Sequence, residues 1–248
     1  MIDALVTAVR TLTTIPIPGR DARDMSRSLP WFVGVGALLG ALVAAVGNGS
    51  AAIFGGQPLV VGALTCLAGA ALTGALHIDG LADSADAFLG GRDRDSVLRI
   101  LKDSRIGCFG ATAVGFDLLL KAALCGQLVV SGLAIVVALS MVLARTVQAL
   151  MLSMMPYARG SEGTAHPFSS GGRFLPVLAA EIVACAALVY WSQGWHGTAA
   201  VGIAGVAAVL LCVYFMRRIQ GITGDCVGAT SEVFEVVFLA CMCATPHV

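Results

Sequence analysis

The sequence predicts an all-α, polytopic membrane protein, a bundle of about seven transmembrane helices with an interfacial helix at the N-terminus. The mean hydropathy of the 248 residues is +0.89. Only 12% of them are charged, about half of the roughly 25% that a soluble domain carries. Apolar stretches recur at close to the ~20 residues that cross a hydrocarbon core of about 30 Å. We expect one membrane-embedded domain over residues 1–248.

Each apolar stretch is a candidate span, taken in chain order. The segment before Pro16 lacks a basic leader and a small-residue cleavage site, so it predicts an interfacial helix and not a signal peptide. The last stretch is short unless it begins near Thr230. The seven predicted spans cover residues 31–54, 59–76, 108–130, 133–155, 175–191, 198–216 and 233–244.

Charge placement predicts the orientation. The 15 Lys and Arg balance the 15 Asp and Glu, which excludes a nucleic-acid binder held by a basic surface. Every Lys and Arg except Lys121 and Arg145 falls in the N-terminal segment or in loops that the predicted spans put on the same side of the membrane as the N-terminus. By the positive-inside rule these loops are cytoplasmic, and the polar motifs share that face. We expect the membrane to be the inner membrane of a prokaryote.

The strongest motif is acidic and follows the second predicted span, where residues 77–88 read HIDGLADSADAF. The spacing of Asp79, Asp83 and Asp86 stacks three carboxylates on one helical face. A divalent cation would turn their repulsion into coordination, and such oxygen ligands suit Mg²⁺ that keeps waters for a phosphate substrate. Gly80 leaves room for close backbone approach. The alternative is a solvated, acidic helix end.

A second motif precedes the third span, with the sequence KDSRIGCFG at residues 102–110. Arg105, beside Asp103 and Ser104, is followed by two glycines. This arrangement can bring a guanidinium and backbone N–H groups to a phosphate. Lys102 adds a second positive charge.

The third motif, GITGDCVGATSEVFE, precedes the last span. Asp225, Glu232 and Glu235 recur on one predicted helical stripe, and carboxylates entering a span are functional candidates. A helix N-cap is the alternative for Asp225. Within the spans, Asp117 and Lys121 are four residues apart and can neutralise each other. The partners of Arg145, Gln148 and Glu181 stay open.

Other site chemistries have no motif. His77, His166, His196 and His247 lack metal-ligand spacing, and no GxSxG, P-loop or GxGxxG is present. The eight cysteines form no CxxC pair and are interpreted as small buried residues. Glycine pairs such as Gly36 with Gly40 and Gly62 with Gly69 predict close helix packing.

Taken in order, these motifs resemble the adenosylcobinamide-GDP ribazoletransferase (cobalamin synthase) family. TIPIPG near residue 14 and PYARG at residues 156–160 extend the likeness over nearly the whole chain. Ile78, Ala87 and Cys108 depart slightly from the family pattern, without loss of a polar group. The resemblance implies a membrane enzyme that joins α-ribazole or its phosphate to adenosylcobinamide-GDP, releases GMP and requires Mg²⁺.

The combined interpretation assigns roles. Metal ligands are Asp79, Asp83, Asp86 and Asp225, the last as ligand or as general base, and these four with Arg105 are the catalytic residues. The predicted substrate-binding residues are His77, Gly80, Lys102, Asp103, Ser104, Arg105, Arg145, Arg159 and Glu232. Oligomerisation stays open. The competing class is a transporter with Asp117, Arg145 and Glu181 on its pathway.

Overall fold

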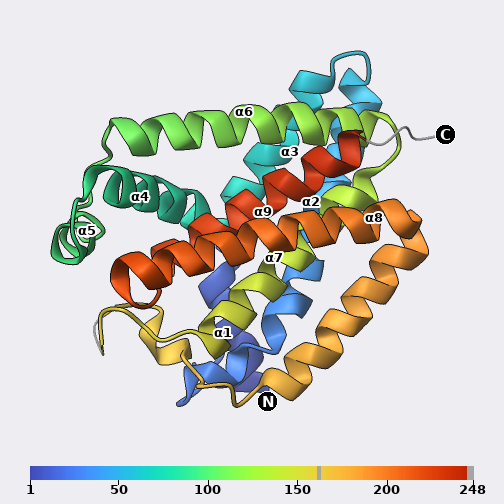
Figure 1. The fold of residues 1–248 in the computed structure, drawn as a ribbon. Helices are drawn as coiled ribbons and strands as arrows, with labels where there is room; N and C mark the ends of the chain where they lie inside the picture. Colours follow the sequence, from blue (N-terminus) through green and yellow to red (C-terminus); the bar gives the residue numbers. More distant parts are fainter. Residues whose placement is uncertain (161–162, 245–248) are drawn as a thin grey trace.

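The computed structural model describes residues 1–160 and 163–244 as a bundle of helices (Figure 1). Two single-turn 3₁₀ helices, Met25–Ser28 and His166–Phe168, lie in the connections. No β-strand occurs in these ranges, so the all-α class is confirmed. The α-helices are α1 (Ile2–Leu12), α2 (Trp31–Phe54), α3 (Pro58–Thr73), α4 (Leu76–Gly90), α5 (Arg94–Ile100), α6 (Cys108–Val130), α7 (Ala134–Met154), α8 (Leu175–Ile219) and α9 (Gly224–Ala244).

Within the described ranges, five helices are long and apolar enough to cross a membrane, namely α2, α6, α7, α8 and α9, and the bent pair of α3 and α4 raises the number to six. The predicted count of seven is not confirmed. The predicted count exceeds the number of span-length helices because it treats residues 175–191 and 198–216 as two spans, whereas both belong to the 45-residue α8. Gly194 has non-helical φ and ψ of 60° and −151°, and α8 turns back there in two legs (Figure 1).

The N-terminal helix, α1, ends at Leu12, one turn before Pro16. Its buried residues, among them Ala8 and Val9, join the core, and α1 packs against α2. Arg10 donates hydrogen bonds to the carbonyls of Ile17 and Gly19, which ties the following segment back to the helix.

Small residues let the helices approach closely, as predicted. A Cβ added at Gly40 of α2 would lie 2.5 Å from the carbonyl oxygen of Ala138 on α7, and one at Gly62 of α3 would overlap Ala122 of α6. Gly69 meets only the tip of a valine. In lipid, where apolar burial gives no advantage over the acyl chains, such backbone proximity supplies packing energy.

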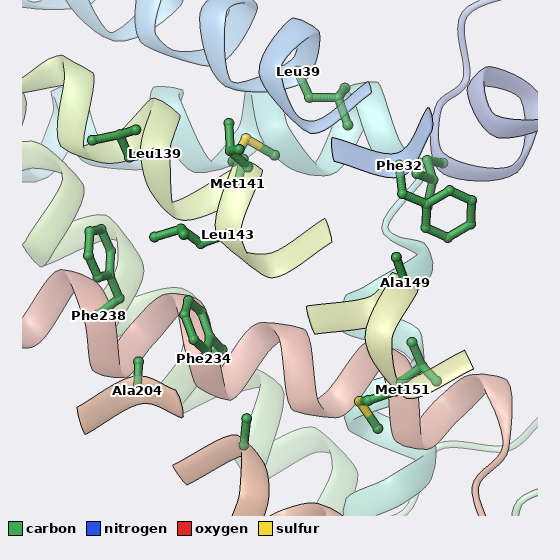
Figure 2. Close-up of a cluster of buried hydrophobic side chains, with 14 of the residues drawn as sticks. Phe32, Leu39, Leu139, Met141, Leu143, Ala149, Met151, Ala204, Phe234 and Phe238 are labelled. Carbon is green, nitrogen blue, oxygen red and sulfur yellow. The ribbon is translucent and has the colours of Figure 1, made fainter. Parts of the chain in front are cut away.

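The core lies around α7. Figure 2 shows Phe32 of α2 near Ala149 of α7, with Phe234 and Phe238 on α9. In its most apolar window α7 is 83% buried, against 22% for α8. The bundle therefore forms around α7, and most of α8 is left to face lipid.

A sharp bend joins α3 to α4. Gly74 and Ala75 both adopt the left-handed conformation, with φ of 62° and 57°, and the two helices meet at 92°. Thr14 covers the end of α3, because its N–H bonds the Leu72 carbonyl at 2.8 Å and its hydroxyl bonds the Ala71 carbonyl at 3.0 Å. The bend directs α4, which carries the acidic motif, against α6 and α9.

The basic loops meet at one end of the bundle. Arg94 of α5 donates to the carbonyls of Ala158 at 2.9 Å and Ile219 at 3.2 Å. Arg218 donates to the Gly91 carbonyl at 2.7 Å. The loops following α4, α7 and α8 are thus joined by guanidinium–carbonyl bonds, which agrees with the expectation that they share one face.

Candidate active site

The acidic helix α4 crosses α9 at two glycines. A Cβ at Gly80 would lie 3.0 Å from the Asp225 carbonyl oxygen, and one at Gly228 would lie 3.2 Å from the Cα of His77. Larger residues at either glycine would separate the helices. This crossing brings Asp79 of the first motif to the same cavity wall as Asp225 of the third.

Carboxylates outnumber cations at the crossing. Asp83 experiences the negative charges of Asp79, Asp86 and Asp225, and among its main electrostatic neighbours only Arg159 is positive. Asp79 is exposed and Asp83 half-buried. The site therefore carries an excess of negative charge that favours a cation.

Asp225 is held in place from two sides. Thr223 donates its hydroxyl to Asp225 Oδ2 at 3.1 Å, and Arg159 Nη2 lies 3.7 Å from the same oxygen. Asp225 stands in the first turn of α9, at the end of the span. Thr223 was missed by the sequence reasoning. A hydroxyl two residues before an acid, as in GITGD, was the available signal.

Arg159 has unused hydrogen-bonding capacity. Its side chain is 13% exposed, yet Nε and Nη2 are buried and bond no group in the part of the chain that the structure describes. A buried, unsatisfied donor is costly. An oxyanion beside Asp225 would accept from this guanidinium, which is the interaction that the predicted substrate-binding role of Arg159 requires.

A cavity of about 410 Å³ opens beside Asp79 and Asp225. Asp79, Asp225 and Gly80 contribute the wall from α4 and α9, and the apolar lining includes Phe32, Leu152 and Phe168. The volume lies in the range of about 300–1,000 Å³ that is usual for small-molecule sites. His77, which is 4% exposed, lines both this cavity and a smaller one of about 60 Å³ inside the bundle.

Asp86 caps α6. Its Oδ2 accepts from the Gly107 N–H at 2.6 Å, and its Oδ1 accepts from the Gly110 N–H at 2.9 Å. The backbone N–H groups of Gly107 and Gly110, which the sequence analysis predicted to face a phosphate, therefore donate to this carboxylate instead. Its negative charge also complements the N-terminal end of the α6 dipole.

The second motif lies at the surface. Arg105 has a side chain that is 86% exposed and pairs with Asp103 at 2.6 Å. This hydrogen bond from Arg105 lowers the pKa of Asp103 to about 2. Lys102 and Ser104 are exposed on the same segment. Among the described residues, no hydrogen bond or ion pair joins Arg105 to the carboxylates of the α4–α9 crossing.

Two predicted substrate-binding residues lie elsewhere, in what we call the buried ionic network: Asp117, Lys121, Arg145, Glu232 and Glu235. Arg145 Nη1 bonds Glu235 Oε1 at 2.7 Å. Lys121 bonds Glu232 and, at 2.8 Å, Glu235, with Asp117 at 3.9 Å. Arg145 and Glu232 are only 1% and 4% exposed. Sequence spacing could not show that they pair with charges on other helices.

The predicted ligand set is not assembled as a closed metal cage. Among residues 1–160 and 163–244, no three His, Cys, Asp or Glu side chains converge closely enough to hold a metal ion. The oxygen donors nevertheless fit Mg²⁺, which proteins commonly bind through one or two carboxylates together with water and substrate phosphates. Every cysteine is a free thiol, and His247 lies outside the described residues.

Comparison with known proteins identifies the family. The family model described as cobalamin-5-phosphate synthase matches residues 4–243. An adenosylcobinamide-GDP ribazoletransferase of Chlorobium phaeobacteroides (strain BS1) is 41% identical over 235 residues, covering 94% of each chain. That of Ralstonia pickettii (strain 12J) is 38% identical, covering 95% of this chain and 93% of its own. No solved structure matches. The chain therefore belongs to the cobalamin-5-phosphate synthase family and is a membrane transferase of cobalamin biosynthesis.

Proposed function

We propose that the enzyme joins α-ribazole, or its 5′-phosphate, to adenosylcobinamide-GDP and releases GMP, with Mg²⁺ bound at the α4–α9 crossing. The observation that carries this proposal is the buried Arg159, whose Nε and Nη2 bond no group in the described ranges, beside the carboxylate of Asp225. A diphosphate that carries a metal ion satisfies both the guanidinium and the carboxylates. Its oxygens accept hydrogen bonds from the guanidinium, and the ion offsets the negative charge of the carboxylates.

The chain's own residues supply alignment and charge. A ribose hydroxyl of α-ribazole forms a bond to the phosphorus attached to the aminopropanol arm, and the bond from that phosphorus to GMP breaks. Asp79 or Asp225 accepts the hydroxyl proton, and Thr223 orients Asp225 for this role. Arg159 donates to the phosphate as negative charge develops on it. When bound, Mg²⁺ would be held by Asp79, Asp83 or Asp225 and would polarise the diphosphate.

The reaction is tested directly with purified protein in lipid nanodiscs. Incubation with adenosylcobinamide-GDP, α-ribazole and Mg²⁺ is expected to release GMP and form one corrinoid product per GMP. A chelator should stop the release, and restored Mg²⁺ should recover it. GMP release that does not depend on α-ribazole would indicate hydrolysis and contradict the proposed transfer.

We also place this site at the cytoplasmic face of the inner membrane. The support is the positive-inside rule together with the joining of the basic loops at one end of the bundle. In a cysteine-free background, Ser96→Cys should react with an impermeant thiol reagent only from the cytoplasmic side, and Ser131→Cys only from the opposite side. Labelling of both from one side would overturn the orientation.

A further inference from the structure

The cavity beside the carboxylates has a lining of mixed character. Asp79 and Asp225 contribute charge from α4 and α9, whereas α2, α7 and the segment after residue 163 contribute Phe32, Leu152 and Phe168. The rings of Phe32 and Phe168 lie 6.0 Å apart at 58°. Both phenylalanines are almost fully buried. The cavity is therefore built for a molecule with one flat apolar part and one polar part.

We propose that this cavity is the binding site for α-ribazole, with the benzimidazole base against Phe32 and Phe168 and the ribose toward Asp79 and Asp225. This inference rests on the proposed function. Size supports it, since a volume of about 410 Å³ suits a nucleoside, whereas a corrinoid carrying GDP is several times larger. The corrinoid macrocycle then stays outside, and only its diphosphate arm reaches the carboxylates.

Polarity distinguishes the ribazole base from guanine, the other flat ring that the two substrates bring. Guanine carries several hydrogen-bond donors and acceptors on its edge, and each costs free energy when buried without a partner. The lining also includes Thr11, His77, Gln148 and Thr164, but the surface formed by Phe32 and Phe168, with Leu12 and Met25, offers a base no hydrogen-bond partner. A dimethylated benzimidazole presents methyl groups there instead, and these gain from burial.

The first test measures binding without chemistry. Wild-type protein in nanodiscs, without the corrinoid substrate, should unfold at a higher temperature when α-ribazole is added. In Phe168→Leu, about tenfold more α-ribazole should be needed for the same shift, because an aromatic contact is lost from an apolar pocket. Phe32→Leu removes the other aromatic ring of the cavity, from α2, and should have the same effect. It replaces Phe168→Leu in the test if that variant fails to fold.

The matched control is Phe238→Leu. Phe238 is fully buried on α9, away from Phe32 in the core view (Figure 2), and it does not line the cavity. This variant loses the same ring but should keep the wild-type dependence on α-ribazole concentration. An equal loss in Phe238→Leu would mean that general loosening of the core explains the effect, and would overturn the assignment.

The second test uses turnover. Phe168→Leu should raise the KM for α-ribazole about tenfold while leaving the KM for adenosylcobinamide-GDP near the wild-type value. A rise only in the KM for adenosylcobinamide-GDP would assign the cavity to guanine and overturn the proposal. The binding arm requires no turnover. A Phe168-dependent shift in a protein that releases no GMP would therefore support the cavity assignment while contradicting the proposed reaction.

Discussion

The buried ionic network and the carboxylates of the α4–α9 crossing differ in how their charges are balanced. In the buried ionic network, Arg145, Lys121, Glu232 and Glu235 lie in the middle of their helices and are joined by direct ion pairs. At the α4–α9 crossing, Arg159 acts on both Asp83 and Asp225, while Asp79 adds further negative charge. Paired charges inside the bundle hold helices together, whereas the excess carboxylates at its end are available to a ligand.

The largest expected effect comes from breaking the network. Glu235→Gln leaves Arg145 without its carboxylate partner and takes one partner from Lys121. We expect a loss of about 3–5 kcal/mol in the free energy of unfolding, because a buried charge is left uncompensated. The yield of monodisperse protein and its thermal unfolding measure this effect.

Asp117→Asn is the control for that variant. The network has three carboxylates for two cations, and Asp117 Oδ2 is buried without a hydrogen-bond partner in the described part of the chain. The substitution should cost less than about 1 kcal/mol, because Asp117 lies 3.9 Å from Lys121 and is its weakest partner. A loss as large as that of Glu235→Gln would contradict this account of the network.

Asp225→Asn is expected to have the next largest effect, on the chemistry and not on folding. GMP release should fall by at least about 100-fold at saturating substrate, since the change removes a candidate base and ligand. The unfolding temperature should stay within a few degrees of the wild-type value. A variant with normal turnover would remove Asp225 from the site, and one that unfolds would make its role structural.

A smaller effect is expected at Arg159. Arg159→Lys keeps the charge but loses the two-pronged guanidinium, so GMP release should fall about tenfold. The matched control is Arg105→Lys, in an exposed residue paired with Asp103, for which we expect a change of less than about threefold. The reverse order of the two rates would move the phosphate-binding role to Arg105, as the second motif predicts.

The effect expected at Asp86 is small and falls on the free energy of unfolding, not on the chemistry. Asp86→Asn removes a charged acceptor from the first turn of α6, which should cost about 1 kcal/mol. The Mg²⁺ concentration that gives half-maximal GMP release should stay unchanged if capping is its main role. A raised Mg²⁺ requirement would restore Asp86 to the metal ligands that the sequence predicts.

The lipid environment made much of the fold predictable. The ends of α2 and α6 agree with the predicted spans, because a helix in lipid must be long and apolar. Close helix packing at Gly40 also followed from residue size, although its partner Ala138 did not. The turn of α8 at Gly194 was foreseen only as a gap between two apolar stretches, so the number of spans differs from the number of helices.

The candidate site was predictable in its parts but not in its assembly. Asp79, Asp225 and Arg159 each stand in a recognisable motif; the α4–α9 crossing brings Asp79 and Asp225 to one cavity wall, and Arg159 lies 3.7 Å from Asp225. The bond between Asp86 and Gly107 spans 21 positions, and that between Arg145 and Glu235 spans 90. Such partners are chosen by helix packing in three dimensions. Spacing along the chain therefore identified these polar residues but not their partners.

The order of synthesis gives the network a consequence for assembly. Lys121 and Arg145 enter the membrane on α6 and α7, before the acidic partners on α9 exist. Each cation near the centre of a span opposes insertion by about 2.5–3.5 kcal/mol until it is paired. Insertion of α9 therefore completes the bundle and at the same time places Asp225 at the cavity. A nascent chain that stops before α9 lacks the carboxylate partner of Arg145, leaves Lys121 only the more distant Asp117 of its own helix and has no third motif, so incomplete molecules are both inactive and easily unfolded.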